Sequence, residues 1–167
     1  MKFVFESQYP NGGWPQRFPL ENNYGRHITF NDKAMVNAMQ ILDSVAVARA
    51  PDYTFVSADE RKRAREAFAR GVDCILKCQI RSPRDNGKLT AWCQQHDEVT
   101  LAPAKARSYE LPSIAAAESS DIVLLLMSID KPMPQVIDSI TRGDGFSMLI
   151  SSRTMSELSA AAIDGSS

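Results

Sequence analysis

The chain has 167 residues, 44% of them hydrophobic and 23% charged, which suffices for one domain with a buried core but is short for a two-domain enzyme. Its 19 basic and 20 acidic residues give a formal net charge of −1, so no overall field attracts nucleic acid or an anionic membrane. We therefore predict no nucleic-acid partner, no membrane partner and no obligate protein partner.

The apolar stretch at the N-terminus is too short for a signal-peptide core, and no apolar run in the chain approaches the roughly 20 residues of a membrane span. Residues 9–28 are rich in proline and glycine, which is typical of a loop. Trp14 lies between Gly13 and Pro15 in this loop. Its indole can offer a flat face to a sugar ring or fill the base of a helical bundle, and chemistry alone leaves both open.

The first helix is predicted to begin near Thr29, because Thr29-Phe-Asn-Asp32 has the spacing of a capping box. Apolar side chains then follow the helical period and should face the core. They are Phe30, Ala34, Ala38, Ile41, Leu42 and Val45.

A second capping box, Ser57-Ala-Asp-Glu60, predicts the start of a longer helix. Its apolar stripe comprises Ala64, Ala67, Phe68, Gly71, Val72, Ile75 and Leu76. Cys74 and Cys78 lie one turn apart on this helix, and we interpret them as small buried hydrophobic residues. With Cys93 they make an odd count of three, which argues against a disulfide framework and against a zinc site.

Residues 81–112 form a long polar connection. Such length inside a compact domain is usually functional or disordered, and the residues here favour function. Trp92 raises the same question as Trp14. The chemically reactive residues follow closely: His96, Asp97, Glu98, Lys105, Arg107, Tyr109 and Glu110.

Two carboxylates with nearby cations can act in three ways. They can be the acid and base of glycoside hydrolysis, oxygen ligands for calcium, or members of a solvated salt-bridge network. Asp97 and Glu98 are adjacent, and neighbours in an extended loop point apart, which counts against a cooperating hydrolytic pair. A lone histidine such as His96 is more often a structural hydrogen-bonding residue than a catalyst.

A third helix is predicted over residues 113–129, with Ile114, Ala117, Ile122, Leu125, Leu126 and Ile129 facing inward. A short fourth helix follows Pro134 and carries Val136, Ile137 and Ile140. The pattern predicts an all-α fold of antiparallel helical hairpins with long functional loops. Residues 1–142 form this domain, and the serine-rich residues 143–167 are predicted to be a poorly packed tail.

Four segments resemble the signature blocks of polysaccharide lyase family 10, the family of certain pectate lyases. They are Tyr9-Pro-Asn-Gly-Gly-Trp-Pro-Gln16, His27-Ile-Thr-Phe-Asn-Asp32, Leu89-Thr-Ala-Trp-Cys-Gln-Gln-His-Asp-Glu98 and Ala106-Arg-Ser-Tyr-Glu110. The blocks keep the family's order over residues 8–141. The resemblance implies a toroid-like (α/α) fold, a partial catalytic domain in residues 1–142 and an extracellular or periplasmic location. It also implies calcium-dependent β-elimination of α-1,4-linked polygalacturonate.

The resemblance also implies roles for single residues. Arg107 occupies the position matched to the base that removes the C5 proton, although arginine ordinarily stays protonated. Its alternatives are a clamp on a substrate carboxylate or a salt bridge to Asp97 or Glu98. Asp32 matches an acidic position and would bind calcium with Asp97 and Glu98, or hold cationic groups; its alternative is the third helical position of the capping box. The implied substrate-binding residues are Trp14, Asn31, Trp92, His96, Lys105 and Tyr109.

Two of the family's blocks have no counterpart here, one of them upstream and carrying a further acidic residue, the other beyond Arg142. The alternative function is therefore a catalytically incomplete remnant or a carbohydrate-binding module for pectin. Helices without their family neighbours should also expose apolar side chains, which predicts self-association and low thermal stability. The residues concerned are Ile41, Leu42, Val45 and Leu124–Leu126.

Overall fold

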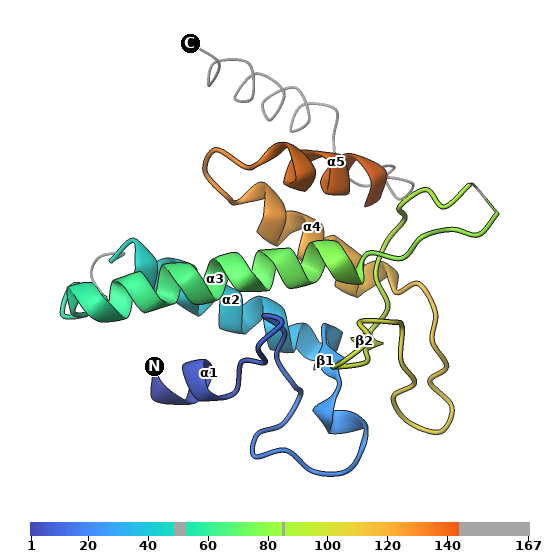
Figure 1. Cartoon of the computed structure of the whole chain (residues 1–167), viewed down its shortest axis with the longest axis horizontal. Coiled ribbons are helices and arrows are strands. Elements are labelled where there is room, and N and C mark those ends of the chain that lie inside the picture. Colours follow the sequence, from blue (N-terminus) through green and yellow to red (C-terminus); the bar gives the residue numbers. More distant parts are fainter. Residues whose placement is uncertain (49–52, 85, 144–167) are drawn as a thin grey trace.

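Two antiparallel helices, α2 (Ala34–Ala46) and α3 (Ala58–Cys78), form the centre of the computed structural model, which describes residues 1–48, 53–84 and 86–143 (Figure 1). Helix α4 (Ala116–Met127) packs against α2 and α5 (Pro134–Gly143), and α5 also packs against α3. The short helix α1 (Lys2–Glu6) and the 3-10 turn η1 (Tyr24–Arg26) lie in the N-terminal segment. The predicted all-α fold is confirmed, because helices make up the core.

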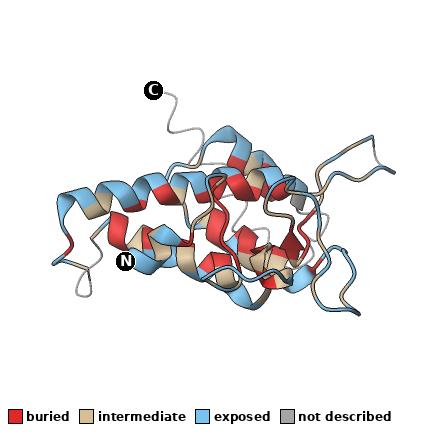
Figure 2. Ribbon diagram, turned by 60° about the horizontal axis from the view of Figure 1, so that its bottom comes forward, coloured by how far each residue is buried: buried red, intermediate tan, exposed pale blue. Residues whose placement is uncertain are grey.

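Helix α3 begins as predicted. The Ser57 hydroxyl accepts a hydrogen bond from the Glu60 amide at 3.2 Å, and the Glu60 carboxylate accepts one from the Ser57 amide at 3.3 Å. Its apolar stripe faces α2, and Figure 2 shows the buried residues concentrated where the helices meet. Gly71 belongs to this contact, since a Cβ atom there would lie 3.0 Å from both Met39 and Trp14. The absence of a side chain at Gly71 therefore lets Trp14 and α2 approach the helix closely.

Helix α2 begins at Ala34, so the capping box predicted at Thr29 is wrong. Asp32 and Lys33 adopt left-handed backbone angles, with φ of 53° and 59°, which interrupts any helix starting at Thr29. The Thr29 hydroxyl donates to the His27 carbonyl and accepts from the Gln95 amide group instead. Leu42 and Val45 are buried as predicted, whereas Ile41 is 38% exposed and does not face the core.

Helix α4 begins at Ala116, three residues later than predicted. The preceding residues stay extended because Ile114 forms an antiparallel bridge with Cys93, and the Ala115 amide donates to the Trp92 carbonyl at 2.9 Å. Ile114 and Ala117 are exposed, so their predicted inward positions are wrong. Ile122, Leu125 and Leu126 are buried as predicted, as are Val136 and Ile140 of α5. Residues 144–167, nearly all of the predicted tail, lie outside the described residues.

A two-stranded antiparallel sheet, which the sequence did not indicate, joins two loops. Strand β1 (Ile28–Thr29) pairs with β2 (Gln95–His96), with Ile28 opposite His96 and Thr29 opposite Gln95. The 3-10 turn η2 (Asn31–Lys33) follows β1, and the amides of Phe30 and Asn31 both donate to the Gln94 carbonyl. The sheet therefore brings residues just before β1 beside residues just after β2.

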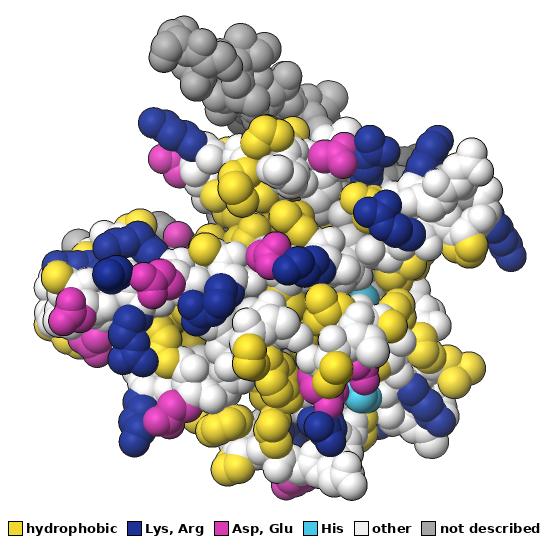
Figure 3. Space-filling model, viewed as in Figure 1, with side chains coloured by type: hydrophobic (Ala, Val, Ile, Leu, Met, Phe, Trp, Pro, Cys, Tyr) yellow, Lys and Arg dark blue, Asp and Glu magenta, His cyan; other side chains and the backbone are white. Residues whose placement is uncertain are grey.

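All three cysteines are free and buried, as the interpretation of Cys74 and Cys78 as small core residues requires. Within the described ranges, the helices are too short or too polar to cross a membrane. Basic and acidic side chains are interspersed over the left and centre of the face seen in Figure 3, and basic ones prevail at its upper right.

Candidate functional site

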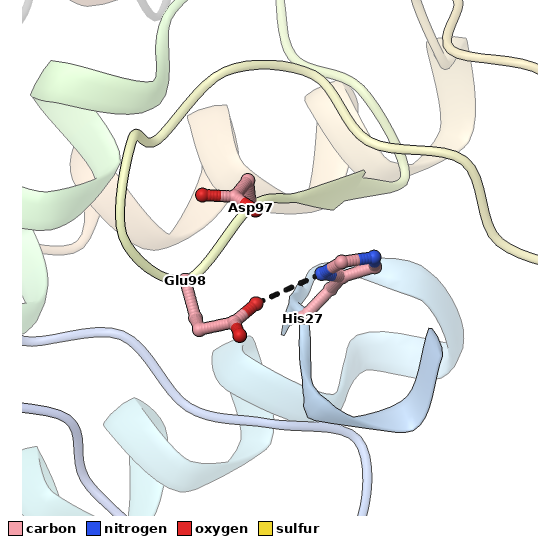
Figure 4. Close-up of side chains that lie close together, drawn as sticks. All are labelled: His27, Asp97 and Glu98. Atoms are coloured by element: carbon pink, nitrogen blue, oxygen red, sulfur yellow. Dashed lines mark hydrogen bonds and ion pairs between the residues drawn. The ribbon is translucent and has the colours of Figure 1, made fainter. Parts of the chain in front are cut away.

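Glu98 joins the two loops that meet at the small sheet (Figure 4). Its Oε2 atom lies 2.9 Å from Nδ1 of His27, and its Oε1 atom lies 2.5 Å from Nε of Arg26 in an ion pair. The Asn11 side chain donates to the Glu98 backbone carbonyl at 2.8 Å, which adds the N-terminal loop to the same network. The Glu98 side chain is only 10% exposed, so this is a largely buried carboxylate with both oxygens engaged.

Two opposing effects act on the pKa of Glu98. Burial disfavours the charged form, but hydrogen bonds from its own backbone and from His27, together with the charge of Arg26, hold the pKa below its usual 4.5. Glu98 is therefore a fixed anion at neutral pH. A group with this pKa and these partners is suited to holding loops together, not to exchanging protons with a substrate.

Asp97 has a different environment. Its Oδ1 atom accepts hydrogen bonds from the amides of Val99 and Thr100, at 3.0 and 2.7 Å, and from the Thr100 hydroxyl at 2.9 Å. The Thr100 bonds lower the pKa of Asp97, so the group is charged at neutral pH. Within the described part of the chain its Oδ2 atom accepts no hydrogen bond. Asp97 thus keeps one negatively charged oxygen available for a ligand.

The ligand atoms of His27, Asp97 and Glu98 lie within 4.8 Å of one another, a spacing that one metal ion could bridge. Calcium takes six to eight oxygen ligands. Both Glu98 oxygens are engaged by Arg26 and His27, and an imidazole nitrogen is a poor calcium ligand, so only Asp97 fits. The predicted ligand set of Asp32, Asp97 and Glu98 does not form, because Glu98 is engaged and Asp32 lies outside the group.

Asp32 is exposed in η2, beyond the end of β1. Its left-handed backbone is not helical, so Asp32 cannot be the third helical position of a capping box, and that alternative is wrong. The adjacent Lys33 pairs with Asp121 of α4 at 2.9 Å, which anchors the turn on that helix. In the described residues, no hydrogen bond or ion pair occupies the Asp32 carboxylate. Asp32 therefore remains a candidate for binding a cation.

The two tryptophans belong to the core, so their predicted role as sugar platforms is wrong. Trp14 is 3% exposed and donates from Nε1 to the Val4 carbonyl at 2.9 Å. Trp92 is fully buried and donates to the Ile75 carbonyl at 2.8 Å. Neither indole presents a face to a ligand, because α1 and α3 supply their hydrogen-bond partners and their surroundings.

His96 is also buried, so its predicted contact with substrate is wrong. Its Nδ1 atom lies 2.8 Å from the Leu101 carbonyl and therefore carries the proton, while Nε2 accepts from the Cys93 amide at 3.2 Å. Burial lowers the pKa of His96 to about 4. The neutral ring fixes the loop after β2 and is a structural hydrogen-bonding residue.

Arg107 makes a two-point ion pair with Glu110, so the alternative of a salt bridge to Asp97 or Glu98 is wrong. Nε donates to Oε2 of Glu110 at 2.8 Å, and Nη2 pairs with Oε1. The Glu110 hydrogen bond and charge raise the pKa of Arg107 further above its usual value. To act as a base, the guanidinium would first have to be deprotonated. The ion pair with Glu110 favours the protonated form and therefore opposes the predicted base role.

The remaining candidates differ in accessibility. Asn31 is half-buried, whereas Lys105 and Tyr109 are exposed in the same loop as Arg107. The sequence did not single out Arg26 and His27 as partners of Glu98. The place of His27 in the His27–Asp32 block, with Arg26 just before it, was the available signal, but His27 and Glu98 are 71 positions apart and their pairing depends on the sheet.

A family model described as pectic acid lyase matches residues 1–157, so the chain belongs to the pectic acid lyase family. It is similar to the structure of a family 10 polysaccharide lyase from Cellvibrio cellulosa, with 38% identity and a TM-score of 0.80 over 86% of this chain. A second structure, an aspartate-to-alanine variant of that lyase in complex with trigalacturonic acid, gives the same identity and TM-score.

The matched part covers 43% and 44% of those two lyase chains, so this chain spans less than half of their length. No curated protein matches it.

Proposed function

We propose that this chain acts as a pectate lyase that cleaves α-1,4-linked polygalacturonate by calcium-dependent β-elimination. The observation that carries the proposal is the uncommitted oxygen of Asp97, held beside the fixed Glu98 network in a chain of the pectic acid lyase family. The Cellvibrio lyase bound to trigalacturonic acid supports a polygalacturonate substrate.

The chemistry explains why an available carboxylate matters. Cleavage of the C4–O4 bond follows removal of the C5 proton, which is weakly acidic because it lies α to the C6 carboxylate. When bound, calcium neutralises that carboxylate and stabilises the negative charge that develops on it. We assign Asp97 as a calcium ligand and Asp32 as a second acidic candidate. Glu98 holds the loop that presents Asp97.

Arg107 enters this proposal as a cation. Glu110 keeps its guanidinium charged, and a charged guanidinium suits a substrate carboxylate better than it suits proton removal. Solvent water or hydroxide takes the C5 proton, the C4–C5 double bond forms as the C4–O4 bond breaks, and the leaving O4 oxygen takes a proton from water. The chain's own residues are therefore assigned to binding and charge stabilisation.

A pectin-binding module without lyase activity is the second candidate. It is favoured by one observation: among the acidic residues Asp32, Asp97 and Glu98, only Asp97 combines a place in the close group with an uncommitted oxygen. Hydrolysis by Asp97 and Glu98 is a weaker candidate, because the ion pairs of Glu98 leave it no proton to donate and no free oxygen to attack.

The test measures ultraviolet absorbance of unsaturated uronate when the purified chain meets polygalacturonate, with calcium and with a chelator. A calcium-dependent rise supports the lyase. Binding in affinity electrophoresis without any rise indicates the binding module. New reducing ends without unsaturation indicate hydrolysis and contradict β-elimination.

A further inference from the structure

The chain between α3 and β2 forms a β-hairpin over residues 80–91, which projects from the body of the molecule (Figure 1). The Thr90 amide donates to the Ile80 carbonyl at 2.8 Å, and the Ser82 amide donates to the Lys88 carbonyl at 2.8 Å. These bonds pair the two arms of the hairpin. The side chains that it carries are therefore displayed on a folded element, apart from the Glu98 network.

The turn of this hairpin follows from its sequence. Asn86 and Gly87 have left-handed backbone angles, with φ of 51° and 72°, and these two residue types tolerate that conformation best. The Gly87 amide donates to the Ser82 carbonyl at 2.9 Å, which closes the turn. Nη1 of Arg81 donates to the Gly87 carbonyl at 3.1 Å, so this guanidinium lies along the hairpin while its charge remains uncancelled.

The hairpin carries three exposed cations, Arg81, Arg84 and Lys88. None of the three forms an ion pair with any residue that the structure describes. Asp85 is the acidic residue of the same segment and lies outside the described residues. Three basic residues and one acidic residue give residues 80–91 a net charge of +2, in a chain whose formal net charge is −1.

Neighbouring helices do not cancel this charge. Lys77 of α3 pairs with Asp73, and Arg142 of α5 pairs with Asp138, so both acidic groups are already matched by a cation. Basic side chains prevail in Figure 3 over the region from which the hairpin projects in the same view of Figure 1. The hairpin is therefore a local positive surface on a chain that is nearly neutral overall.

The composition of the hairpin indicates which anionic polymer it suits. Residues 80–91 include no aromatic side chain, although proteins that bind single-stranded nucleic acid stack bases on such residues. Ile80 and Leu89 are half-buried, so neither offers the exposed apolar face that an interfacial membrane contact uses. Cations without either feature suit a polymer of carboxylates that is bound through its charge alone.

We propose that this hairpin is a second, non-catalytic binding surface for a polyuronate chain, contacted through Arg81, Arg84 and Lys88. The choice of polyuronate rests on the proposed function, whereas the surface itself needs no calcium. Each exposed ion pair contributes little alone. A long chain held at the candidate site and at the hairpin gains from both, because the second contact is then intramolecular.

The experiment measures binding of polygalacturonate to the whole chain in a chelator at low salt. A variant with Arg81→Gln, Arg84→Gln and Lys88→Gln should bind about tenfold more weakly, and the difference should vanish at high salt because the surface charges are then screened. A variant with Arg81→Lys and Arg84→Lys keeps all three charges and should bind like the unsubstituted chain. Melting temperatures of both variants show whether the fold is retained.

A matched control removes the same charge elsewhere. Lys2, Lys62 and Lys131 are exposed on α1, in the first turn of α3 and in the loop before α5. In Figure 1 these segments lie at the opposite end of the molecule from the hairpin. Replacing all three with Gln should leave polygalacturonate binding unchanged. An equal loss in this control would show that net charge and not the hairpin is responsible, and would overturn the proposal.

The class of polymer is tested in the same titration. Fully methyl-esterified polygalacturonate has no carboxylate charge, so its binding should not depend on the three cations. Single-stranded DNA and vesicles that contain phosphatidylserine should bind more weakly than polygalacturonate. Tighter binding of either one, lost in the triple Gln variant, would overturn the assignment to a polyuronate.

Failure of the surface is distinguishable from failure of the lyase proposal. Normal binding by the triple Gln variant, or no binding by the unsubstituted chain in chelator at low salt, would overturn the surface. Calcium-dependent elimination with either result would leave the lyase proposal standing. Binding that depends on the hairpin, without elimination, would support the surface and contradict the lyase.

Discussion

The Oε2 atom of Glu98 lies 2.9 Å from Nδ1 of His27, although the two residues are 71 positions apart in the sequence. Arg26, next to His27, holds the other carboxylate oxygen. The pair thereby connects the segment before β1 with the segment after β2. The position of Asp97 therefore depends on the contacts that the adjacent Glu98 makes with Arg26 and His27. Glu98 is in this sense a structural residue inside a functional motif.

Replacing Glu98 by Gln should destabilise the chain. The substitution leaves the charge of Arg26 without its partner, and because Arg26 is partly exposed we expect a loss of about 1–3 kcal/mol. Urea unfolding measures this loss. Glu66→Gln on the exposed face of α3 is the matched control and should change stability by less than about 0.5 kcal/mol. An equally stable Glu98→Gln variant would contradict the assigned role.

Lowering the pH should weaken the contacts of the Glu98 carboxylate with Arg26 and His27. The folded pKa of Glu98 is below its usual 4.5, so its contribution to stability is present above about pH 4.5 and is lost as pH falls through the folded value. The Glu98→Gln variant should therefore lose less stability than the unsubstituted chain on acidification below about pH 4.5.

His96 should make stability depend on pH in a higher range. Its folded pKa of about 4 is below the usual 6.5, so the unfolded chain binds the additional proton between these values and stability falls as pH falls from about 6.5 to about 4. The difference of about 2.5 in pKa corresponds to about 3 kcal/mol. His96→Gln should remove this slope in urea unfolding at a series of pH values. An unchanged slope would show that another group is responsible.

Trp14→Phe should affect stability and not ligand binding. Phenylalanine fills most of the site but cannot donate to the Val4 carbonyl, so we expect a loss of about 1–3 kcal/mol. Affinity electrophoresis on polygalacturonate should show unchanged retardation. Trp92→Phe, which leaves the Ile75 carbonyl without its donor, should behave in the same way. Retardation lost without a stability change would restore the platform interpretation.

Exposed apolar side chains should promote self-association, although the responsible set is smaller than the sequence indicated. Leu42, Val45, Leu125 and Leu126 are buried, which leaves Ile41 and Leu124 of the predicted patch on the surface. Replacing both with Gln should shift the protein toward monomer in sedimentation equilibrium. A monodisperse, unsubstituted monomer with a high melting temperature would contradict the expectation.

Apolar periodicity predicted the helices well, but it did not predict where the loops pair with one another. The same capping-box spacing occurs at Ser57 and at Thr29, but only Ser57 caps a helix. Thr29 instead belongs to β1, where Gln95 of a distant strand occupies its hydroxyl. Strands of two residues carry no periodicity, so the sequence could not indicate this pairing.

The sequence identified the segments that make up the candidate site but not the contacts of their individual residues. Asp97 and Glu98 were singled out together, yet their roles separate because Arg26 and His27 engage only Glu98. Trp14 could not be assigned from chemistry alone, since Val4, Met39 and Gly71 close over it only in the folded chain. The motif alone could not indicate the charge state of Arg107, because its partner Glu110, three residues later, keeps the guanidinium charged.

The most direct test of the account measures formation of unsaturated uronate from polygalacturonate by the unsubstituted chain and by Asp97→Asn. Asparagine keeps an oxygen to accept the Val99 and Thr100 amides, so the loop should stay folded while the free negative charge is lost. Asp73→Asn on exposed α3 is the control.

We predict calcium-dependent product with the unsubstituted chain and the control, and at least about a hundredfold less with Asp97→Asn. Equal product from Asp97→Asn, or the same rate in chelator, would contradict this prediction.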